Sequence, residues 1–425
     1  MLKEICVSNF KSIHSEITFS MEADLERVSE YPDHIIHIGD NALLKVTSMY
    51  GPNGGGKTNL LSALALAKAL FVNGENSLII PQQLSNVFHE NQIIEETLFF
   101  VTKDYEIGYH FKMLPEVIQR NNINPMLGIT QNVNYMILYH ILEEDVSYRK
   151  TNETDFISLF SRNELGEVNS QAFDELRILE NVNLSKNKSV INYVYNTFAN
   201  NNSELQECLH VIKCLALELL SIQDLTVHNI SNNEKILSII KINRKKLIQL
   251  LNHVDIKIKD IKLYNSNHYY PIFFVRELET ENNKIEKEIS LSEESAGTQK
   301  IFWMFVNILS SIAHQNIFLC DDMNALLHPK LFRSIVELFT SKENQTSQLI
   351  FNSHDILNMD SNLFRRDEIW FIYRDENYST QAVPLSNIVN YKGEQVRKDA
   401  KYSKQYLEGK YGADPFIKKG LFWDD

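Results

Sequence analysis

The chain has 425 residues, of which 44% are hydrophobic and 23% are charged, and its formal net charge is -13 at pH 7. This length exceeds what one hydrophobic core usually fills, so we expect an ordinary globular protein with two or more lobes. The negative charge gives no overall electrostatic footprint for DNA or RNA, although a local basic face is compatible with it.

The cysteines and the apolar segments indicate the compartment. Four cysteines show neither metal-ligand spacing nor a disulfide framework, which fits a reducing compartment. The N-terminus, MLKEICVSNF, carries charges where a signal peptide needs an apolar run. The longest apolar segment, IFWMFVNILSSIA, is too short to span a bilayer. We therefore expect a cytoplasmic protein without a membrane partner.

A phosphate-binding loop lies near the N-terminus. Residues 1–20 predict two strands, which we assign to the same sheet as a strand at residues 43–50. That strand runs into GPNGGGKT and then into an Ala- and Leu-rich helix, which is the context that a G-x-x-x-x-G-K-[ST] loop requires. The alternative, a glycine-rich turn with a solvated lysine, is much rarer in this context.

The loop predicts ATP and Mg²⁺ as ligands. Its glycines let backbone N–H groups turn toward a phosphate, and the helix N-terminus adds partial positive charge. Lys57 would reach the β- and γ-phosphates, and the Thr58 hydroxyl would bind Mg²⁺. The predicted nucleotide-binding residues are Asn53, Gly54, Gly55, Gly56, Lys57, Thr58 and Asn59.

The middle of the chain changes from strand to helix patterns. Residues 93–113 alternate on either side of Lys103 and Asp104 and predict a β-hairpin, and 132–144 predict a further strand. From residue 166 the pattern is helical, most clearly at 205–222. The predicted domains are 1–75 and 261–425, two parts of one nucleotide-binding head, with a β-rich insertion at 76–165 and a helical insertion at 166–260.

A second anion site is predicted at residues 289–309, ISLSEESAGTQKIFWMFVNIL. A polar segment with Ser295, Gly297 and Thr298 opens a helix that has one apolar face. Free N–H groups and hydroxyls at such a helix start bind anions. Taken alone, the same pattern is more often a simple N-cap.

Two later strands end in polar residues. The stretch IFLCDDMNALLHP, residues 317–329, predicts a buried parallel strand that ends at Asp321 and Asp322. Beside a phosphate loop, Asp321 is placed to hold Mg²⁺ and Asp322 to orient the attacking water. QLIFNSHDILNMD, residues 348–360, predicts a strand that ends at Ser353 and His354. The alternatives are a solvated turn for the aspartates and a structural role for the histidine.

The order of these motifs is that of ABC-type and SMC-type ATPase heads. The chain resembles the AbiLi-type ATPases of bacterial abortive infection and phage defence, which are relatives of the OLD and SMC heads. The resemblance rests on SNFKSI, YPDHIIHI, GPNGGGKTNLL, EESAGTQKIF, LHP, SHD, FRRDEIWFI and QYLEGKYGADPFI. It implies an α/β fold, namely an ABC/SMC-like P-loop head with an antiparallel β insertion and a helical insertion.

The resemblance also implies roles for individual residues. Asp321 would be the Walker B magnesium ligand together with Thr58, Asp322 the catalytic carboxylate and His354 the γ-phosphate switch. The signature residues of one subunit would contact the γ-phosphate held by another; they are Ser295, Gly297 and Thr298.

The chain departs from the family pattern at the catalytic carboxylate. The family usually has glutamate where this sequence has Asp322, and Asn324 stands at a nearby position that is commonly acidic. An aspartate carboxylate would sit about 1.5 Å back from the water, a displacement that can cost on the order of a hundredfold in rate. We therefore expect slow ATP hydrolysis.

Three classes of function are compatible with these motifs. The first is an ATP-dependent sensor or scaffold that forms a homodimer or higher homo-oligomer and controls a separate effector, such as a TOPRIM- or HNH-type nuclease. The second is a RecF-like or SMC-like DNA-binding repair ATPase. The third, a self-contained nuclease or toxin, lacks a TOPRIM D-x-D motif or a convincing HNH cluster. Basic clusters at 241–247 and 392–419 are solvated faces or contact surfaces for an acidic partner or nucleic acid.

Overall fold

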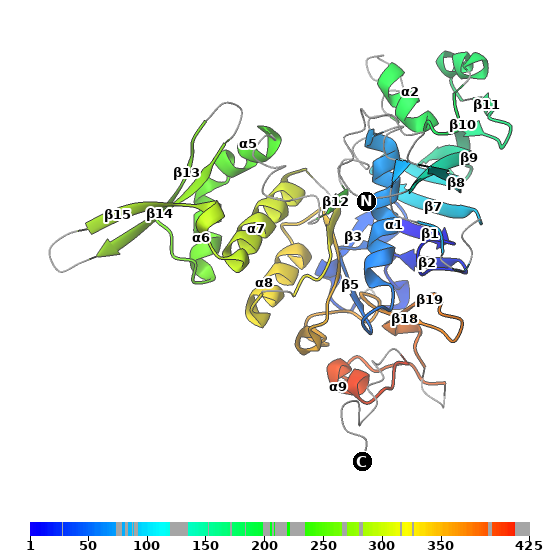
Figure 1. Cartoon of the computed structure of the whole chain (residues 1–425). Helices are drawn as coiled ribbons and strands as arrows, with labels where there is room; N and C mark the ends of the chain where they lie inside the picture. The colour runs from blue at the N-terminus through cyan, green and yellow to red at the C-terminus, as the bar shows by residue number, and fades with distance from the viewer. Residues whose placement is uncertain are drawn as a thin grey trace.

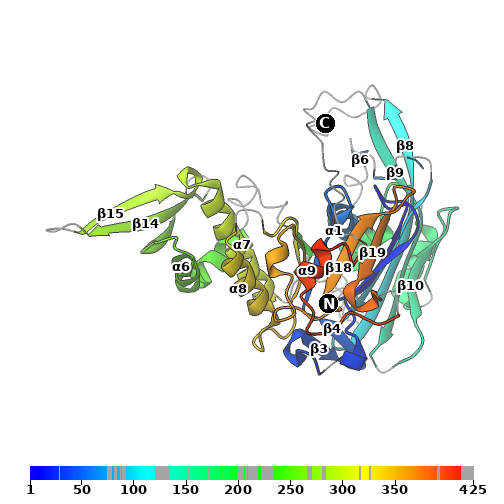
Figure 2. The same ribbon diagram turned by 90° about the horizontal axis from the view of Figure 1, so that it is seen from below.

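The computed structural model has two sheets on either side of one helix, with a smaller lobe projecting to one side (Figures 1 and 2). It describes residues 1–27, 29–73, 79–80, 84–86, 88, 92–119, 135–151, 153–170, 172–182, 184–198, 205, 208, 219–221, 234–265, 270–279, 284–314, 317–324, 327–389 and 393–412. None of the helices in these ranges is both long enough and apolar enough to cross a membrane.

The first sheet carries the phosphate loop. Among the described residues its strand order is β12, β16, β17, β5, β18, β19, and only β19 runs antiparallel to its neighbour. Strands β16, β17 and β5 are buried along their whole length, as expected for parallel strands covered on both faces. The strands are β12 (Leu219–Ser221), β16 (Ile317–Cys320), β17 (Gln348–Asn352), β5 (Val46–Tyr50), β18 (Ile369–Arg374) and β19 (Thr380–Pro384).

The second sheet is antiparallel. Within the described ranges its order is β11, β10, β9, β8, β7, β1, β2, with β6 paired to β9. The hairpin predicted at 93–113 is confirmed, because β7 and β8 turn at Lys103 and Asp104. The strand predicted at 132–144 is confirmed within β9, although residues 132–134 lie outside the described residues. The strands are β1 (Leu2–Ser8), β2 (Ile17–Ser20), β6 (Ile79–Ile80), β7 (Ile94–Val101), β8 (Tyr105–Gln119), β9 (Tyr135–Lys150), β10 (Ile157–Arg162) and β11 (Val168–Asn169).

The prediction that residues 1–20 begin the nucleotide-binding sheet is wrong. Strand β1 pairs antiparallel with both β2 and β7, so these strands belong to the second sheet. Burial along β1 alternates, with Leu2, Ile5 and Val7 fully buried. One buried face suits an antiparallel sheet, whereas strands of a doubly covered parallel sheet are apolar throughout. The domain boundaries at 75, 165 and 260 stay predictions.

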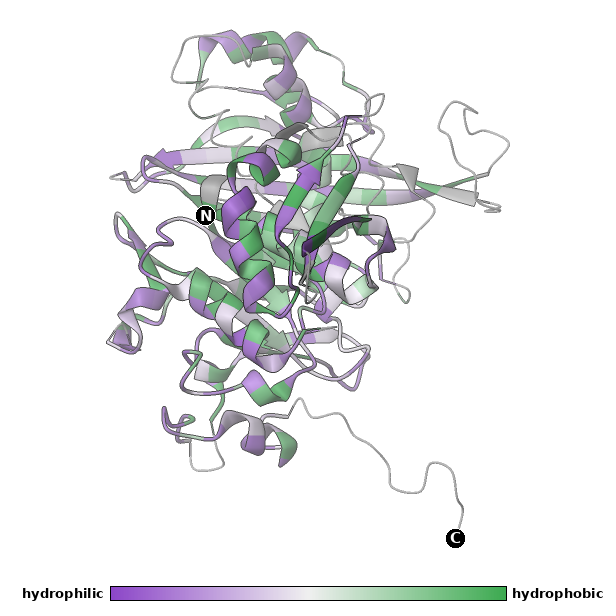
Figure 3. Ribbon diagram, turned by 90° about the vertical axis from the view of Figure 1, so that its left-hand side faces the viewer, coloured by the Kyte–Doolittle hydropathy of each residue, from purple (hydrophilic) through white to green (hydrophobic). Residues whose placement is uncertain are grey.

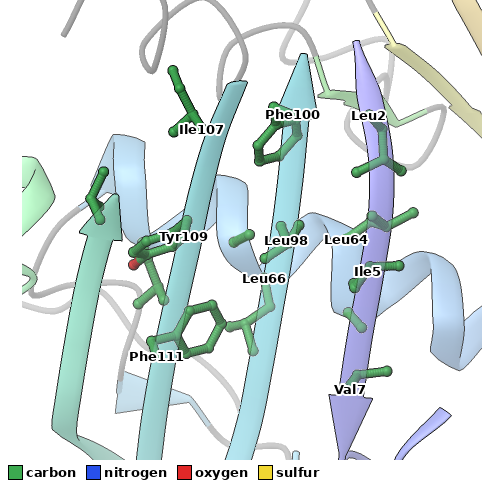
Figure 4. Packing of buried hydrophobic residues seen from close by; sticks show 14 of the residues in the cluster. Leu2, Ile5, Val7, Leu64, Leu66, Leu98, Phe100, Ile107, Tyr109 and Phe111 are labelled. Carbon is green, nitrogen blue, oxygen red and sulfur yellow. The ribbon is translucent and has the colours of Figure 1, made fainter. Parts of the chain in front are cut away.

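Helix α1 (Lys57–Asn73) packs between the two sheets. It is apolar nearly all round, as a helix covered on opposite sides must be. One hydrophobic cluster joins α1 to strands of both sheets. Figure 4 shows its contacts with the antiparallel sheet, where Leu64 and Leu66 face side chains of β1, β7 and β8. This packing fixes the start of α1, and therefore Lys57, at the end of β5.

The opposite face of the parallel sheet is covered by helices that belong to a second hydrophobic cluster. There α7 (Ala296–His314) and α8 (Pro329–Thr340) pack with residues of the projecting lobe in one hydrophobic cluster. The lobe consists of α5 (Glu234–Ile242), α6 (Arg244–His253), β13 (Asp260–Leu263), β14 (Ile272–Glu279) and β15 (Lys284–Ser290). Helices α2 (Val190–Phe198) and α9 (Tyr402–Leu407) lie elsewhere on the head. Hydrophobic residues gather around the central helices and strands (Figure 3).

Two boundary predictions are also wrong. The single strand predicted at 43–50 is divided into β4 (Asn41–Leu44), which pairs with β3 (Ile35–Ile38), and β5. The chain bends at Lys45 between them, and the buried Lys45 side chain donates a hydrogen bond to the Ser341 carbonyl, 2.8 Å away. Of the helix predicted at 205–222, residues 205 and 208 are helical and 219–221 form β12, while the rest lies outside the described residues. A short apolar run such as LLS fits a strand as well as a helix, and here it pairs with β16.

Two of the motifs that carry the resemblance, YPDHIIHI and FRRDEIWFI, contact each other just before β18. In the YPDHIIHI motif, the Tyr31 hydroxyl donates to the Ser361 carbonyl at 2.7 Å. The ring of His34 lies 2.9 Å from the carboxylate of Glu368, which belongs to the FRRDEIWFI motif. Because Glu368 immediately precedes β18, these contacts fix that strand beside β5.

A buried carboxyl on β7 should make stability depend on pH. Glu96 is fully buried, neither of its oxygens has a hydrogen-bond partner within the described part of the chain, and burial raises its pKa well above the usual 4.5. The native state then keeps a proton that the unfolded state releases. The free energy of unfolding should fall by up to about 1.4 kcal/mol per pH unit above pH 4.5, until the pH passes the native pKa.

Denaturant unfolding of the Glu96→Gln variant from pH 5 to pH 7 tests this expectation. Glutamine does not titrate, so the stability of the variant relative to wild type should increase steadily with pH. Glu180→Gln, which changes an exposed carboxyl, is the matched control. A difference between Glu96→Gln and wild type that does not change with pH would show that Glu96 is ionised in the native protein.

The predicted fold class is confirmed. A phosphate loop follows a central parallel strand, an antiparallel sheet packs on the other side of the loop helix, and a lobe is added that combines the helices α5 and α6 with the strands β13, β14 and β15. This is the α/β arrangement of an ABC/SMC-like P-loop head.

Candidate functional site

The phosphate loop needs glycine at its two ends. Gly51 has φ +150° and Gly56 has φ +111°, conformations that L side chains rarely adopt. A Cβ atom on Gly51 would lie 1.9 Å from the carbonyl oxygen of Ile372, and one on Gly56 would lie 2.2 Å from Oγ1 of Thr380. The loop therefore lies directly against β18 and β19.

Lys57 begins α1 and is almost completely buried, with 5% of its surface exposed. Its Nζ donates hydrogen bonds to the carbonyls of Gly51 and Pro52 at 2.8 and 2.9 Å. Burial lowers its pKa to about 8, against the opposing effect of the Asp321 and Asp322 charges. The ammonium group is thus held inside the loop and stays mostly protonated at pH 7.

Asp321 links the phosphate loop to the two neighbouring strands. It directly follows β16, and its Oδ1 accepts a hydrogen bond from the Thr58 hydroxyl at 2.9 Å. The side-chain amide of Asn352, the last residue of β17, donates to the same oxygen. The predicted pair Thr58 and Asp321 is therefore brought into direct contact.

Asp322 has an unusual backbone conformation. Its φ of +50° is left-handed, which few residues other than glycine, asparagine and aspartate tolerate. Its N–H donates to Oδ1 of Asn352 at 2.5 Å, and its carbonyl accepts from Nζ of Lys300 at 3.3 Å. Two side chains from other elements thus hold this turn, which directs the Asp322 carboxylate to the same cavity as the loop.

His354 follows β17 and lies beside Asn324. The backbone N–H of His354 and the hydroxyl of Ser353 each donate to Oδ1 of Asn324 at 3.0 Å. Burial lowers the pKa of His354, and the nearby positive charge of Lys57 lowers it further. Asn324 therefore positions the histidine segment through its amide oxygen.

Residues of the phosphate loop and residues at the ends of the neighbouring strands line one cavity of about 340 Å³. The predicted nucleotide-binding and catalytic residues meet there, and two further residues join them that the sequence analysis missed, Asn352 and Arg374. Asn352 directly precedes the SHD motif, and Arg374 ends the strand next to β5. The feature that could have identified Asn352 and Arg374 as cavity residues is the position of each at the end of a strand. The lining residues are Asn53, Gly54, Gly55, Gly56, Lys57, Thr58, Asn59, Asp321, Asp322, Asn352, His354 and Arg374.

The signature residues do not line this cavity. Ser295 caps α7, because its hydroxyl accepts a hydrogen bond from the Thr298 N–H at 3.2 Å, so the N-cap alternative is also realised. Ser295 is exposed. A Cβ atom on Gly297 would meet only the Ser295 hydroxyl, at 3.8 Å. The surface at this helix start is open.

The chain is similar to one protein family and to solved structures that include two SMC heads. The family model described as "AAA domain, putative AbiEii toxin, Type IV TA system" matches residues 46–360. The SMC head domain from Thermotoga maritima has 13% identity and a TM-score of 0.39, with coverage of 90% of this chain and 98% of that chain. The SMC head bound to the C-winged helix domain of ScpA has 12% identity, a TM-score of 0.45 and coverage of 91% and 98%. No curated protein sequence gives a significant match.

Proposed function

This chain belongs to that AAA-domain family and is a P-loop ATPase, and we propose that it closes over Mg²⁺-ATP at sites shared between two copies. In this proposal it is an AbiLi-type sensor of anti-phage defence that controls a separate effector. The observation that carries the nucleotide site is the meeting of Lys57, Thr58 and Asp321 in one cavity.

The residues beside the loop fit a magnesium ion. Mg²⁺ prefers oxygen ligands and is usually bound by one or two carboxylates together with phosphate oxygens. The Thr58 hydroxyl and Oδ1 of Asp321 offer two such oxygens 2.9 Å apart, and Asn352 holds the carboxylate in place. The ion would neutralise part of the phosphate charge.

Asp322 and His354 supply the polar groups next to the reacting phosphate. Asp322 would accept the proton of the attacking water, although its side chain is one methylene shorter than the usual glutamate. Burial lowers the pKa of His354 in the protein without nucleotide, and its ring would offer an N–H donor to the phosphate. Slow turnover would prolong the ATP-bound state, which suits a sensor better than a motor.

The signature surface supports a shared site. Ser295, Gly297 and Thr298 lie at an open helix start outside their own head's cavity. A helix start carries partial positive charge and attracts anions, so a second copy's γ-phosphate would fit this surface. Because ATP bridges the two copies in this arrangement, ATP and Mg²⁺ should strengthen self-association.

Replacing Gly297 with glutamate should abolish ATP-induced pairing. The new carboxylate would oppose the γ-phosphate of the second copy, whereas the open space around Gly297 leaves the single head undisturbed. Light scattering with and without Mg²⁺-ATP measures the mass. Wild type should double in mass with ATP, and Gly297→Glu should not.

The exposed change Asn181→Glu is the charge-matched control for this experiment and should pair as wild type does. ATP titration of Gly297→Glu should give nearly wild-type affinity for the single head. Equal masses for wild type and Gly297→Glu in the presence of ATP would contradict the role of the signature surface.

The effector would be a separate protein, such as a TOPRIM- or HNH-type nuclease, because the sequence offers no convincing nuclease motif of its own. A basic surface supports contact with an acidic partner or with nucleic acid. Lys241, Lys245 and Lys246 are exposed where α5 meets α6 on the projecting lobe. Of the second basic cluster, Lys392 and residues 413–419 lie outside the described residues.

A further inference from the structure

Arg374 ends β18 at the rim of the phosphate-loop cavity. Its side chain is exposed and lines the cavity together with Lys57 and the loop glycines. No hydrogen bond or ion pair to its guanidinium is found among the residues that the structure describes. The guanidinium, which is more weakly hydrated than an ammonium group, is therefore available to a ligand at the cavity rim.

The neighbouring strand shows which way Arg374 faces. In the β18–β19 ladder Arg374 pairs directly with Thr380, and directly paired residues extend from the same face of a sheet. The Thr380 hydroxyl donates to the carbonyl of Gly55 at 3.0 Å, so this face points at the phosphate loop. Two residues earlier, the Ile372 carbonyl lies directly against the loop glycines.

The backbone that carries Arg374 is firmly held. Thr380 shares a hydrogen bond of 2.7 Å with the Ser12 hydroxyl, and its N–H donates to the Ser12 carbonyl at 2.8 Å. The Ser379 hydroxyl accepts from the His14 N–H at 3.1 Å. The hairpin is thus anchored both to the loop and to the SNFKSI segment, which keeps the Arg374 side chain within reach of the cavity.

The charges in the cavity favour a phosphate ligand for this arginine. Asp321 and Asp322 bring two negative charges to the lining, and Lys57 contributes one buried positive charge. A single Mg²⁺ ion cancels only part of the charge of a nucleoside triphosphate. Guanidinium groups bind phosphate oxygens through paired, charge-assisted hydrogen bonds.

We propose that Arg374 is a second phosphate-binding cation of the ATP site, supplied by the end of β18 beside the loop. This inference rests on the proposed nucleotide site at Lys57. Arg374 would contact the phosphates of the same head, whereas the signature residues would act on the nucleotide of a second copy.

Calorimetric titration of Mg²⁺-ATP into the full chain tests the proposal. Arg374→Gln should weaken binding about tenfold because a charge-assisted contact is lost. Arg374→Lys keeps the charge and should recover part of the affinity. Arg177→Gln, which removes an exposed arginine on a 3₁₀ helix beside the antiparallel sheet, is the control and should bind like wild type.

The temperature of unfolding distinguishes a phosphate contact of Arg374 from a purely structural role. Without nucleotide, Arg374→Gln should unfold at the wild-type temperature, and only the ATP-induced rise in that temperature should be smaller. Wild-type ATP affinity in Arg374→Gln, with binding lost in Lys57→Ala, would overturn this proposal alone. Wild-type affinity in both variants would instead overturn the proposed nucleotide site.

Discussion

Replacing Lys57 with alanine should weaken ATP binding at least tenfold, or by about 1.4 kcal/mol. The lysine is the cation that the loop holds closest to the β- and γ-phosphates. Its Nζ is already positioned by the carbonyls of Gly51 and Pro52, so little conformational freedom is lost on binding. Calorimetric titration measures the loss.

The dependence of ATP affinity on pH provides a second readout for Lys57. Its pKa is lowered to about 8 in the free protein, and the phosphates of bound ATP would raise it again. Affinity should therefore be full below pH 8 and should decrease as the pH rises through and beyond that value.

The Lys57→Ala variant should lack this decrease. Lys103→Ala, at the exposed turn of the β7–β8 hairpin, is the control and should retain the wild-type pH profile. Unchanged ATP binding in Lys57→Ala would disprove the phosphate-loop assignment.

Lengthening Asp322 to glutamate should accelerate hydrolysis by up to about a hundredfold, because the carboxylate moves toward the attacking water. Asp322→Asn should remove most of the remaining turnover while leaving ATP binding almost unchanged. Phosphate release under single-turnover conditions compares the three side chains directly.

Two further measurements serve as controls for the Asp322 series. One is ATP binding after substitution of the neighbouring Asp321, and the other is the stability of the Asp322→Glu variant. Asp321→Ala should impair binding of Mg²⁺-ATP, because Asp321 faces Thr58 rather than the water. The left-handed backbone at residue 322 suits aspartate and asparagine better than glutamate, so Asp322→Glu should also lose about 1 kcal/mol of stability. If Asp322→Glu folds but is no faster than wild type, another group must orient the water, and His354 is the next candidate.

Local motifs in the sequence predicted which residues meet in one cavity, because each motif lies at the end of a strand. The loop, the Asp-Asp pair and the SHD motif follow β5, β16 and β17, and adjacent parallel strands bring their carboxyl ends together. Arg374 was missed because an arginine at a strand end resembles any solvated residue. Only the pairing of β18 with β5 brings it to the loop.

Sheet membership could not be predicted from the sequence in the same way. Alternation of apolar residues identified β1 and β2 as strands, but β7, which joins β1 to the rest of its sheet, is more than 80 residues away from β1 in the chain. Similarly, LLS at 219–221 belongs to an apolar run that fits helix or strand, and its pairing with β16 decides between them. Long-range pairing is not encoded in local periodicity.

Mixing two inactive variants tests the shared ATP site most directly. Lys57→Ala lacks a working phosphate loop, and Gly297→Glu lacks a working signature, so each alone should hydrolyse almost no ATP. In a mixed dimer one site combines the intact loop of one copy with the intact signature of the other. An equimolar mixture should therefore regain up to about half of wild-type hydrolysis, since neither variant pairs with itself through ATP and each mixed dimer has one complete site of two. A mixture that is no more active than either variant alone would contradict the shared site.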